Sequence, residues 1–270
     1  MQPSDAHESA GAINDRPMFQ VERRRRIMDV VQQVGRVDVA DLAETFDVTN
    51  ETIRRDLNQL QRERLVTRVH GGAVPFRDSM ITEPLQVREG RHAEEKRRIA
   101  QAAALEVPES GSVMIDAGST TAYLTRYVDL DRDLTVITNS VPIFWALATT
   151  VKPHVIMLGG VLRRQTMAFV DETGVEMLRD FTVDVLFMGC DGASVENGFS
   201  VPYRSEAALK RAMISSARRT VMMFDHSKLG NDRLLRFASL AEVDTIVTGV
   251  EVDEATAQRF QEHGPVVVRA

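Results

Sequence analysis

Polar side chains and glycines stand together after an apolar run of the sequence, where they could bind an anion. Residues 113–115 are apolar and are followed by Asp116-Ala117-Gly118-Ser119-Thr120-Thr121 and then by a helical stretch. Gly118 lets a ligand approach the backbone, and the N–H groups and hydroxyls of Ser119, Thr120 and Thr121 can hold an anion at a helix N-terminus. This chemistry suits a phosphate group, although an ordinary helix cap uses the same residue types.

Four further apolar runs end in polar or glycine residues. Their ends are Thr138-Asn139-Ser140, Gly159-Gly160, Gly189-Cys190-Asp191-Gly192-Ala193 and Asp225-His226-Ser227-Lys228. The carboxyl ends of parallel strands lie at one edge of a sheet, and ligands of α/β domains bind beyond that edge. Several such ends together therefore favour a ligand site more strongly than any one of them.

A second group of residues could contact DNA. Thr49 can cap a helix that carries Ile53, Leu57 and Leu60 on one face. At 100° per residue, Glu51, Arg55, Asn58 and Arg62 fall on the opposite face, with Thr52 and Arg54 at its flanks. Arginine and asparagine match guanine and adenine edges in the major groove, and Thr52 could donate to a phosphate. Asp56 faces neither side fully, and we expect it to pair with Arg54 or Arg55.

The elements around this helix predict a winged helix-turn-helix. An amphipathic stripe of Ile27, Val30, Val31 and Val34 indicates a helix over residues 20–35, and Asp38 can cap a second short helix. Asp47-Val48-Thr49 is typical of the tight turn before the third helix. Residues 65–69 have strand composition, and His70-Gly71-Gly72 indicates a hairpin with Arg68 and His70 near its tip.

The charge distribution supports this interpretation of the N-terminal part. The chain has 270 residues and a formal net charge of -6, which taken as a whole argues against a nucleic-acid partner. Residues 23–77, however, carry 11 arginines against eight acidic residues and no lysine. An exposed helix surface would explain so small a bias by itself, so the local pattern decides in favour of DNA.

The same residues carry a family resemblance. The run Val48-Thr49-Asn50-Glu51-Thr52-Ile53-Arg54-Arg55-Asp56-Leu57, followed by Arg68-Val69-His70-Gly71-Gly72-Ala73, resembles the DNA-binding motif of the DeoR family of bacterial transcription regulators. That family usually has glycine between the recognition helix and the wing, where this chain has Arg64. The resemblance implies that ten residues contact DNA: Thr49, Asn50, Glu51, Thr52, Arg54, Arg55, Asn58, Arg62, Arg68 and His70.

The rest of the chain predicts an α/β fold with a mainly parallel sheet. Short β-branched runs alternate with helical stretches, at residues 113–115, 134–138, 154–158, 183–188, 220–224 and 245–247. A helix with Ile99, Ala103 and Leu105 on its apolar face is expected over residues 96–107. We therefore expect a flexible tail over residues 1–17, the winged helix-turn-helix over 18–77, a linker over 78–95 and the larger α/β domain over 96–270.

This second domain resembles the DeoR sensor domain, which is similar in fold to ribose-5-phosphate isomerase and binds phosphorylated sugars. The resemblance implies that Ser119, Thr120 and Thr121 bind phosphate, that Thr138, Asn139 and Ser140 line the pocket, and that Lys228 adds a cation. It also implies contacts to sugar hydroxyls from Asp191 with Gly192 and from Glu206 with Lys210. The strand-end residues Asp116, Gly118, Gly159 and Gly160 complete the expected effector site. A solvent-exposed helix lysine is the alternative for Lys210, and a cap or a partner of Lys228 is the alternative for Asp225.

Other residue types set limits on the function. Cys190 is the single cysteine, so an internal disulfide is excluded and a reducing cytoplasm is expected. We expect Cys190 to be a small buried hydrophobe, and Trp145 to lie in the core or at a subunit contact. The six histidines have no paired metal-ligand spacing, so neither a metal nor a cofactor is predicted. The sequence also has no run for a membrane span and no signal peptide.

Together these patterns predict a transcription regulator, a repressor of carbohydrate-metabolism genes whose binding to double-stranded operator DNA is controlled by a phosphorylated sugar. One reading head contacts few base pairs, so a homodimer or homotetramer is expected. The alternative is a sugar-phosphate isomerase-like enzyme in which Asp191, Glu206 and a lysine do acid–base work. That alternative leaves the arginine-bearing helix and the wing without a purpose, and we rank it lower.

Overall fold

The computed structural model describes residues 20–34, 37–63, 65–69, 71–75, 83–129, 131–150 and 152–270. The chain divides into two compact units, Met1–Asp78 and Ser79–Ala270. Within the described ranges, no helix combines the length and the apolar composition needed to cross a bilayer.

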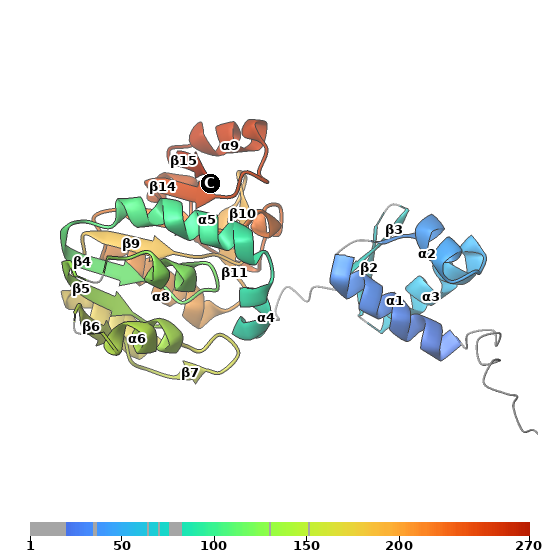
Figure 1. The fold of residues 1–270 in the computed structure, drawn as a ribbon, viewed down its shortest axis with the longest axis horizontal. Helices are drawn as coiled ribbons and strands as arrows, with labels where there is room; N and C mark the ends of the chain where they lie inside the picture. Colours follow the sequence, from blue (N-terminus) through green and yellow to red (C-terminus); the bar gives the residue numbers. More distant parts are fainter. Residues whose placement is uncertain are drawn as a thin grey trace, which may run out of the picture. The chain divides into compact units, whose positions relative to one another are not determined.

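The first unit is a winged helix-turn-helix, as the sequence predicts (Figure 1). Its elements are α1 (Gln20–Val34), β1 (Val37–Asp38), α2 (Val39–Thr45), α3 (Asn50–Arg62), β2 (Val66–Val69) and β3 (Gly72–Pro75). The strands form one antiparallel sheet in the order β1-β3-β2. Asp38 stands at the N-cap of α2 and Thr49 at the N-cap of α3, where its hydroxyl accepts from the Thr52 N–H.

The core of this unit comes from the apolar stripes of its three helices. Ile27 and Val31 of α1 pack with Ile53, Leu57 and Leu60 of α3 in one buried cluster. Val34 was expected on the same stripe, but it lies in the last turn of α1 and its exposed fraction is 64%. The predicted stripe is therefore wrong at its C-terminal end.

The pairing predicted for Asp56 is also wrong. Asp56 is fully buried and accepts from Arg23 Nε at 2.6 Å and from Arg24 Nε at 3.0 Å, both on α1. Asp56 lies beside Ile53, Leu57 and Leu60 on the face that α3 turns to α1, so it cannot reach outward to Arg54 or Arg55. The ion pairs join α1 to α3.

The second unit is built on a seven-stranded sheet in which every pair of neighbours is parallel. In spatial order its strands are β15 (Val266–Arg269), β14 (Thr245–Thr248), β12 (Thr220–Met223), β9 (Val185–Met188), β4 (Ser110–Ile115), β5 (Asp133–Thr138) and β6 (His154–Met157). The α/β fold and all six predicted strands are confirmed. The edge strand β15 was missed, and its only signal is the short run Val266-Val267-Val268.

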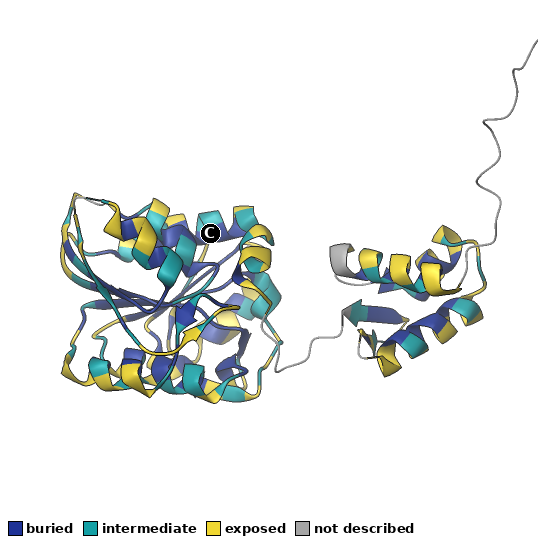
Figure 2. Ribbon diagram, turned by 90° about the horizontal axis from the view of Figure 1, so that it is seen from below, coloured by how far each residue is buried: buried dark blue, intermediate teal, exposed yellow. Residues whose placement is uncertain are grey.

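Helices cover both faces of this sheet, as Figure 2 shows by the buried strands between two helical layers. One face packs against α5 (Ala93–Ala103), η2 (Thr121–Arg126) and α6 (Val141–Ala148). The other packs against α7 (Glu172–Met177), α8 (Arg204–Ser215) and α9 (Glu254–Gln261). Strand residues alternate between the two cores, as Val113 and Met114 do, because successive side chains point to opposite faces.

Smaller elements complete the unit. Two additional sheets pair β7 (Leu162–Arg163) with β8 (Ala168–Phe169), and β10 (Gly192–Ser194) with β11 (Gly198–Val201) and β13 (Leu235–Ala238). Short 3-10 helices are η1 (Ala104–Glu106), η3 (Leu178–Asp180), η4 (His226–Lys228) and η5 (Leu240–Glu242).

Three expectations for the second unit need correction. The linker predicted over residues 78–95 contains α4 (Leu85–Gly90) and the start of α5, and Leu85 is buried. Leu105 is 88% exposed, because α5 ends at Ala103 and the chain continues as η1. Trp145 on α6 is 71% exposed, so the core interpretation fails within this chain and only the subunit contact remains as a prediction.

Candidate functional site

The face of α3 opposite the core presents most of the side chains predicted to contact DNA. Thr49, Asn50, Glu51, Arg54, Arg55, Asn58 and Arg62 are exposed, and Thr52 is half-buried beside Thr49. The contact of Arg54 Nη1 with Glu51 at 4.0 Å is a loose surface pair that leaves its guanidinium accessible. The helix therefore separates a buried apolar face from an outward face of arginine and asparagine.

The wing follows α3 as β2 and β3. Arg68 on β2 is half-buried, and its Nη1 has no hydrogen-bond partner among the described residues. Gly71 adopts a positive φ of 78°, and a Cβ on Gly72 would lie 1.9 Å from the Val37 carbonyl oxygen. The two glycines thus permit the tight turn and the close approach of β1. His70 lies outside the described residues.

In the second unit, the carboxyl ends of β5, β4, β9 and β12 bring most of the predicted effector residues to one edge of the sheet. The Asn139 side chain joins two of these ends, since its Oδ1 accepts from Ala117 N at 2.9 Å. Asp116 follows β4, Asp191 follows β9 and Lys228 follows β12. Residues far apart in the sequence are therefore neighbours here.

Lys210 is central to this edge. It is 3% exposed, and its ammonium group forms a close ion pair with Asp116 and donates to the Gly189 carbonyl at 2.9 Å. Burial alone would lower the pKa of Lys210, but Asp116 and Glu206 outweigh it and raise the pKa. The alternative of a solvent-exposed helix lysine is therefore wrong.

Two further arginine–carboxylate pairs flank Lys210. Arg88 on α4 donates to Asp191 at 3.1 Å, and Arg163 on β7 donates to Glu206 at 2.9 Å. Burial alone would raise the pKa of Asp191, but the charges of Arg88, Lys228 and Lys210 together outweigh it, so this pKa is lowered. Burial and the charge of Asp191 raise the pKa of Glu206 to about 7 against the opposing effect of Lys210 and Arg163.

A small cavity lies at the predicted phosphate loop. Its lining includes Gly118, Ser119, Thr120, Asp191 and Lys228, and its volume is about 10 Å³, room for a single water molecule. Within the described residues, the Lys228 side chain forms no hydrogen bond or ion pair. Hydroxyls, backbone and a cation thus meet in the combination expected for an anion.

A second cavity of about 10 Å³ adjoins the first, and Arg88, Glu206 and Lys210 line both. Asp116, Asn139 and Thr166 also line this second cavity. Cys190 is buried beside the first, and burial raises its pKa to about 12, which confirms the interpretation of a buried small hydrophobe.

Several predicted effector residues have structural partners instead. The Thr121 hydroxyl donates to the Asp116 carbonyl at 2.7 Å, and the helix it begins is the 3-10 helix η2, so its predicted phosphate contact is not supported. The Thr138 hydroxyl donates to the Ile115 carbonyl at 2.6 Å, and the Ser140 hydroxyl caps α6.

The predicted glycines also have packing roles. A Cβ on Gly160 would lie 2.1 Å from Asp171 Oδ1, and one on Gly192 would lie 2.0 Å from the Asn231 carbonyl oxygen. Met177 lies beside Gly159 and accepts a hydrogen bond from its N–H. Gly159, Gly160 and Gly192 are not among the residues that line the two cavities.

Arg88, Lys96 and Arg163 were not predicted as site residues. Lys96 is buried, donates to the carbonyls of Arg88 and Arg91, and lies 3.6 Å from Asp225 Oδ2. Burial lowers the pKa of Lys96 to about 8, although Asp225 acts in the opposite direction. Asp225 caps η4, as its cap interpretation predicts. Arg88 and Lys96 lie in segments predicted as a linker and as an ordinary helix, and no element was predicted for the segment of Arg163.

His92, Glu95 and His226 form a cluster that sequence spacing could not reveal. Their candidate ligand atoms lie within 4.8 Å of one another, and Glu95 accepts from the His226 N–H at 2.8 Å and contacts His226 Nδ1 at 2.7 Å. The carboxylate of Glu95 is thereby engaged by η4, which ties α5 to the end of β12. The prediction of no metal stays a prediction.

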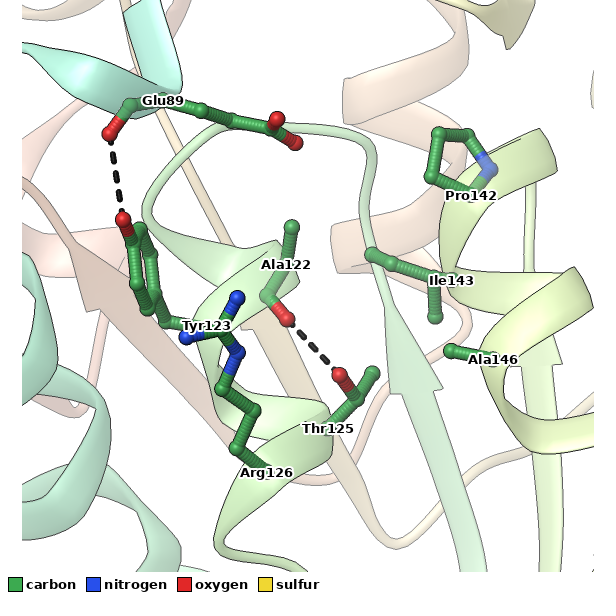
Figure 3. Close-up of a pocket in the computed structure, with 8 residues that line it drawn as sticks. All are labelled: Glu89, Ala122, Tyr123, Thr125, Arg126, Pro142, Ile143 and Ala146. Atoms are coloured by element: carbon green, nitrogen blue, oxygen red, sulfur yellow. Dashed lines mark hydrogen bonds between the residues drawn. The ribbon is translucent and has the colours of Figure 1, made fainter. Parts of the chain in front are cut away.

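A larger hollow of about 350 Å³ lies beside these strand ends, between η2 and α6 (Figure 3). Glu89 of α4 lines it, and the Tyr123 hydroxyl donates to the Glu89 carbonyl at 3.1 Å. Arg126 is its only cationic lining residue among those described, and the negative charge of the Glu89 carboxylate in the same lining disfavours an anion. The strand-end cavities therefore suit an anion better than this larger hollow.

Comparison with known proteins identifies both units. The model of the DeoR-like helix-turn-helix domain matches residues 23–77, and that of the DeoR C-terminal sensor domain matches residues 91–250. The chain belongs to the DeoR family. It is a transcription regulator, and the isomerase-like alternative loses its support because the relatives are regulators.

The relatives are similar to this DeoR-family regulator over most of its length. It is 34% identical to the HTH-type transcriptional regulator GlpR of Haloferax volcanii, over 93% of this chain and 98% of the relative. It is 29% identical to the glycerol-3-phosphate regulon repressor of Escherichia coli, over 91% of this chain and 97% of the relative.

The comparison with solved structures finds matches of lower similarity. The sorbitol operon regulator SorC of Klebsiella pneumoniae matches at a TM-score of 0.41 and 11% identity, over 84% of this chain and 96% of SorC. Ribose 5-phosphate isomerase A of Neisseria gonorrhoeae matches at a TM-score of 0.38 and 21% identity, over 52% of this chain and 55% of the isomerase.

Proposed function

We propose that this DeoR-family regulator represses carbohydrate-metabolism genes and that a phosphorylated sugar bound at the strand-end cavities controls its binding to operator DNA. The observation that carries the proposal is the convergence of Lys228 with Ser119, Thr120 and the backbone at Gly118 around one cavity. A charged ammonium group, two hydroxyls and backbone N–H groups can form charge-assisted hydrogen bonds with a phosphate dianion.

The neighbouring cavity, together with Asp191 of the first cavity, supplies the sugar-binding half of the proposed site. The carboxylates of Asp191 and Glu206 can accept from sugar hydroxyls, and Asn139 adds an amide beside them. A sugar phosphate is larger than the space of either cavity, so binding requires the lining side chains to move. Effector binding is then linked to a change in the protein, as control of DNA binding requires.

Operator recognition is proposed for the outward face of α3. Arg55, Asn58 and Arg62 would read base edges, Thr49, Asn50, Thr52 and Arg54 would fix the helix on the backbone, and the wing would add Arg68 and His70. A DNA-binding domain of residues 18–77, an effector domain that includes α4 and all of α5, an acting site in the cytoplasm, and a homodimer or homotetramer on repeated half-sites complete the proposal.

A thermal-shift screen tests the effector half. We expect glycerol 3-phosphate, fructose 1-phosphate, fructose 6-phosphate or glucose 6-phosphate to raise the Tm of the full chain, because a ligand of the native state stabilises it. The unphosphorylated compounds should have no effect. Lys228→Ala should remove the shift, whereas Lys152→Ala, an exposed lysine just before the N-terminal end of β6, should keep it. A Tm that no phosphorylated compound changes would refute this half.

Binding to the DNA upstream of the protein's own gene tests the operator half. At ~0.15 M salt the full chain should prefer this DNA to random DNA, and Arg55→Ala should weaken binding by about 1–3 kcal/mol if Arg55 reads a base. The control Arg179→Ala, on the surface of the second unit, should bind normally. Equal affinity of the wild type for both DNAs would contradict this half, whatever the thermal-shift result.

A further inference from the structure

We infer that Arg88 is an effector-binding residue. When a phosphorylated polyol binds, its phosphate pairs with the Arg88 guanidinium in place of Asp191, and one of its hydroxyls donates to Asp191 instead. The inference rests on the proposed function of the strand-end site and adds to it the residue and the exchange by which the ligand enters. Arg88 was not among the residues predicted from the sequence.

The position of Arg88 is the first support. It projects from α4 between the two cavities and lines both, with a side chain that is 14% exposed. It shares the first cavity with Ser119, Thr120 and Lys228, so a phosphate held there lies beside the guanidinium. Arginine binds phosphate through two parallel N–H···O bonds, which a lysine cannot provide.

The pairing of the other cations is the second support. Lys210 is bound by Asp116 and by the Gly189 carbonyl, and Arg163 is bound by Glu206 and Ser205. Arg88 contacts Asp191 at 3.1 Å through Nη2. A phosphate dianion that contacts Lys228 alone is paired with one positive charge, whereas one that also contacts Arg88 is paired with two.

The exchange also defines the ligand. When Arg88 turns to a phosphate, the buried carboxylate of Asp191 loses a charged hydrogen bond, and a new donor offsets that loss, since weaker pairing of a buried charge is costly. A hydroxyl group on the same molecule supplies that donor. The site therefore favours a molecule that carries both a phosphate and hydroxyls, and it binds inorganic phosphate or a free polyol more weakly.

The helix that carries Arg88 is joined to three parts of the unit. Leu85 N donates to the Gln165 carbonyl at 2.8 Å, the Tyr123 hydroxyl donates to the Glu89 carbonyl, and Lys96 donates to two carbonyls at the helix end. In the sequence, α4 is the first described element after the wing strand β3. A ligand that moves Arg88 therefore acts on the element through which the chain enters the sensor unit.

Opposite effects of two substitutions test the exchange. Isothermal titration of the full chain uses inorganic phosphate and the four phosphorylated compounds of the screen as probes. Asp191→Asn should bind inorganic phosphate at least fivefold more tightly than the wild type, because Arg88 is released and a repelling carboxylate is removed. Arg88→Gln should weaken inorganic phosphate and every compound that binds the wild type by tenfold or more.

Further variants separate this role from a merely structural one. Arg88→Lys keeps the charge but loses the two-bond geometry, and it should recover only part of the affinity lost in Arg88→Gln. Arg91→Ala removes a surface arginine of the same segment that pairs with Glu83, and it should bind as the wild type does. Amide hydrogen exchange of α4 in the wild type should change when a phosphorylated probe is added. It should stay unchanged when buffer without a probe is added.

The outcomes distinguish the two proposals. If Asp191→Asn binds inorganic phosphate no more tightly than the wild type, or Arg88→Gln binds all probes normally, the exchange is refuted while a positive thermal-shift screen keeps the proposed function. If the wild type binds none of the probes, the proposed function fails, and this inference fails with it. A fold defect in Arg88→Gln leaves the decision to Asp191→Asn and Arg88→Lys.

Discussion

Glu206 is a buried carboxyl group whose charge depends on pH within the neutral range. Its pKa is raised to about 7 by burial and by Asp191, so the folded protein keeps this proton at a pH where an unfolded chain has lost it. Between about pH 4.5 and 7 the unfolded state binds fewer protons, so this group makes the protein less stable as the pH rises. Above the raised pKa its contribution no longer changes.

Glu206→Gln should remove this pH dependence, because the amide does not ionise. We expect the stability of the variant relative to the wild type to increase by on the order of 1–3 kcal/mol between pH 5 and 8. Urea unfolding followed by the fluorescence of Trp145, the single tryptophan, reports on the second unit. The exposed Glu176→Gln should show a pH profile like the wild type. Parallel profiles for Glu206→Gln and the wild type would contradict the raised pKa.

Asp56 is the corresponding buried charge of the DNA-binding unit. Asp56→Ala leaves the paired guanidinium groups of Arg23 and Arg24 without their carboxylate, and we expect it to cost about 3 kcal/mol in the stability of this unit. Amide hydrogen exchange of α1 and α3 measures the loss. Asp41→Asn, at an exposed position of α2, should change the unfolding free energy that exchange measures by less than ~0.5 kcal/mol. Equal protection in the two variants would mean that the Asp56 ion pairs do not hold α1 to α3.

At the scale of elements, the wing depends on glycine at one point of close approach. A Cβ on Gly72 would meet the Val37 carbonyl oxygen at 1.9 Å, which is shorter than any real contact. Gly72→Ala should therefore separate β1 from β3 and destabilise the first unit by about 2–4 kcal/mol. Thermal unfolding followed by circular dichroism measures this. Thr67→Ala, at an exposed position of the same hairpin, should have little effect, and similar melting of both variants would refute the role of Gly72.

Elements with local signals could be predicted from the sequence. The Thr49 cap and the stripe of Ile53, Leu57 and Leu60 lie within one helix, and each strand of the seven-stranded sheet has its own β-branched residues, including the missed β15. Asn139 and Asp191 were identified because polar residues at strand ends converge in any parallel sheet. These inferences needed no knowledge of distant contacts.

The remaining site residues could not be predicted, because their roles depend on partners far away in the sequence. Arg88 and Asp191 are separated by 103 positions, and Lys210 and Asp116 by 94. The segment of α4 looked like a linker because its six residues follow Pro84 and end at Gly90, which is too short for a clear helical periodicity. Conversely, Thr121 has the right residue type, but its hydroxyl is used by the backbone around it.

At the scale of the whole molecule, the formal charge of -6 is an average that includes a basic DNA-binding unit. Residues 23–77 have a net charge of +3, and Asp56 neutralises part of α1 from within the core. Charges more than about 8 Å away are largely screened at 0.15 M salt, so the exposed arginines of α3 determine the attraction to phosphates. An acidic protein can therefore bind DNA through one unit.

The salt dependence of nonspecific binding tests this view. The logarithm of the affinity of the full chain for random duplex DNA should fall linearly with the logarithm of the salt concentration, because each phosphate contact releases counterions. Arg54→Ala should reduce the slope by about one, because exposed Arg54 is the arginine of α3 proposed to contact the DNA backbone. Arg179→Ala, exposed on the acidic unit, should leave the slope unchanged. If both variants reduced the slope equally, the overall charge and not the basic DNA-binding unit would govern DNA binding.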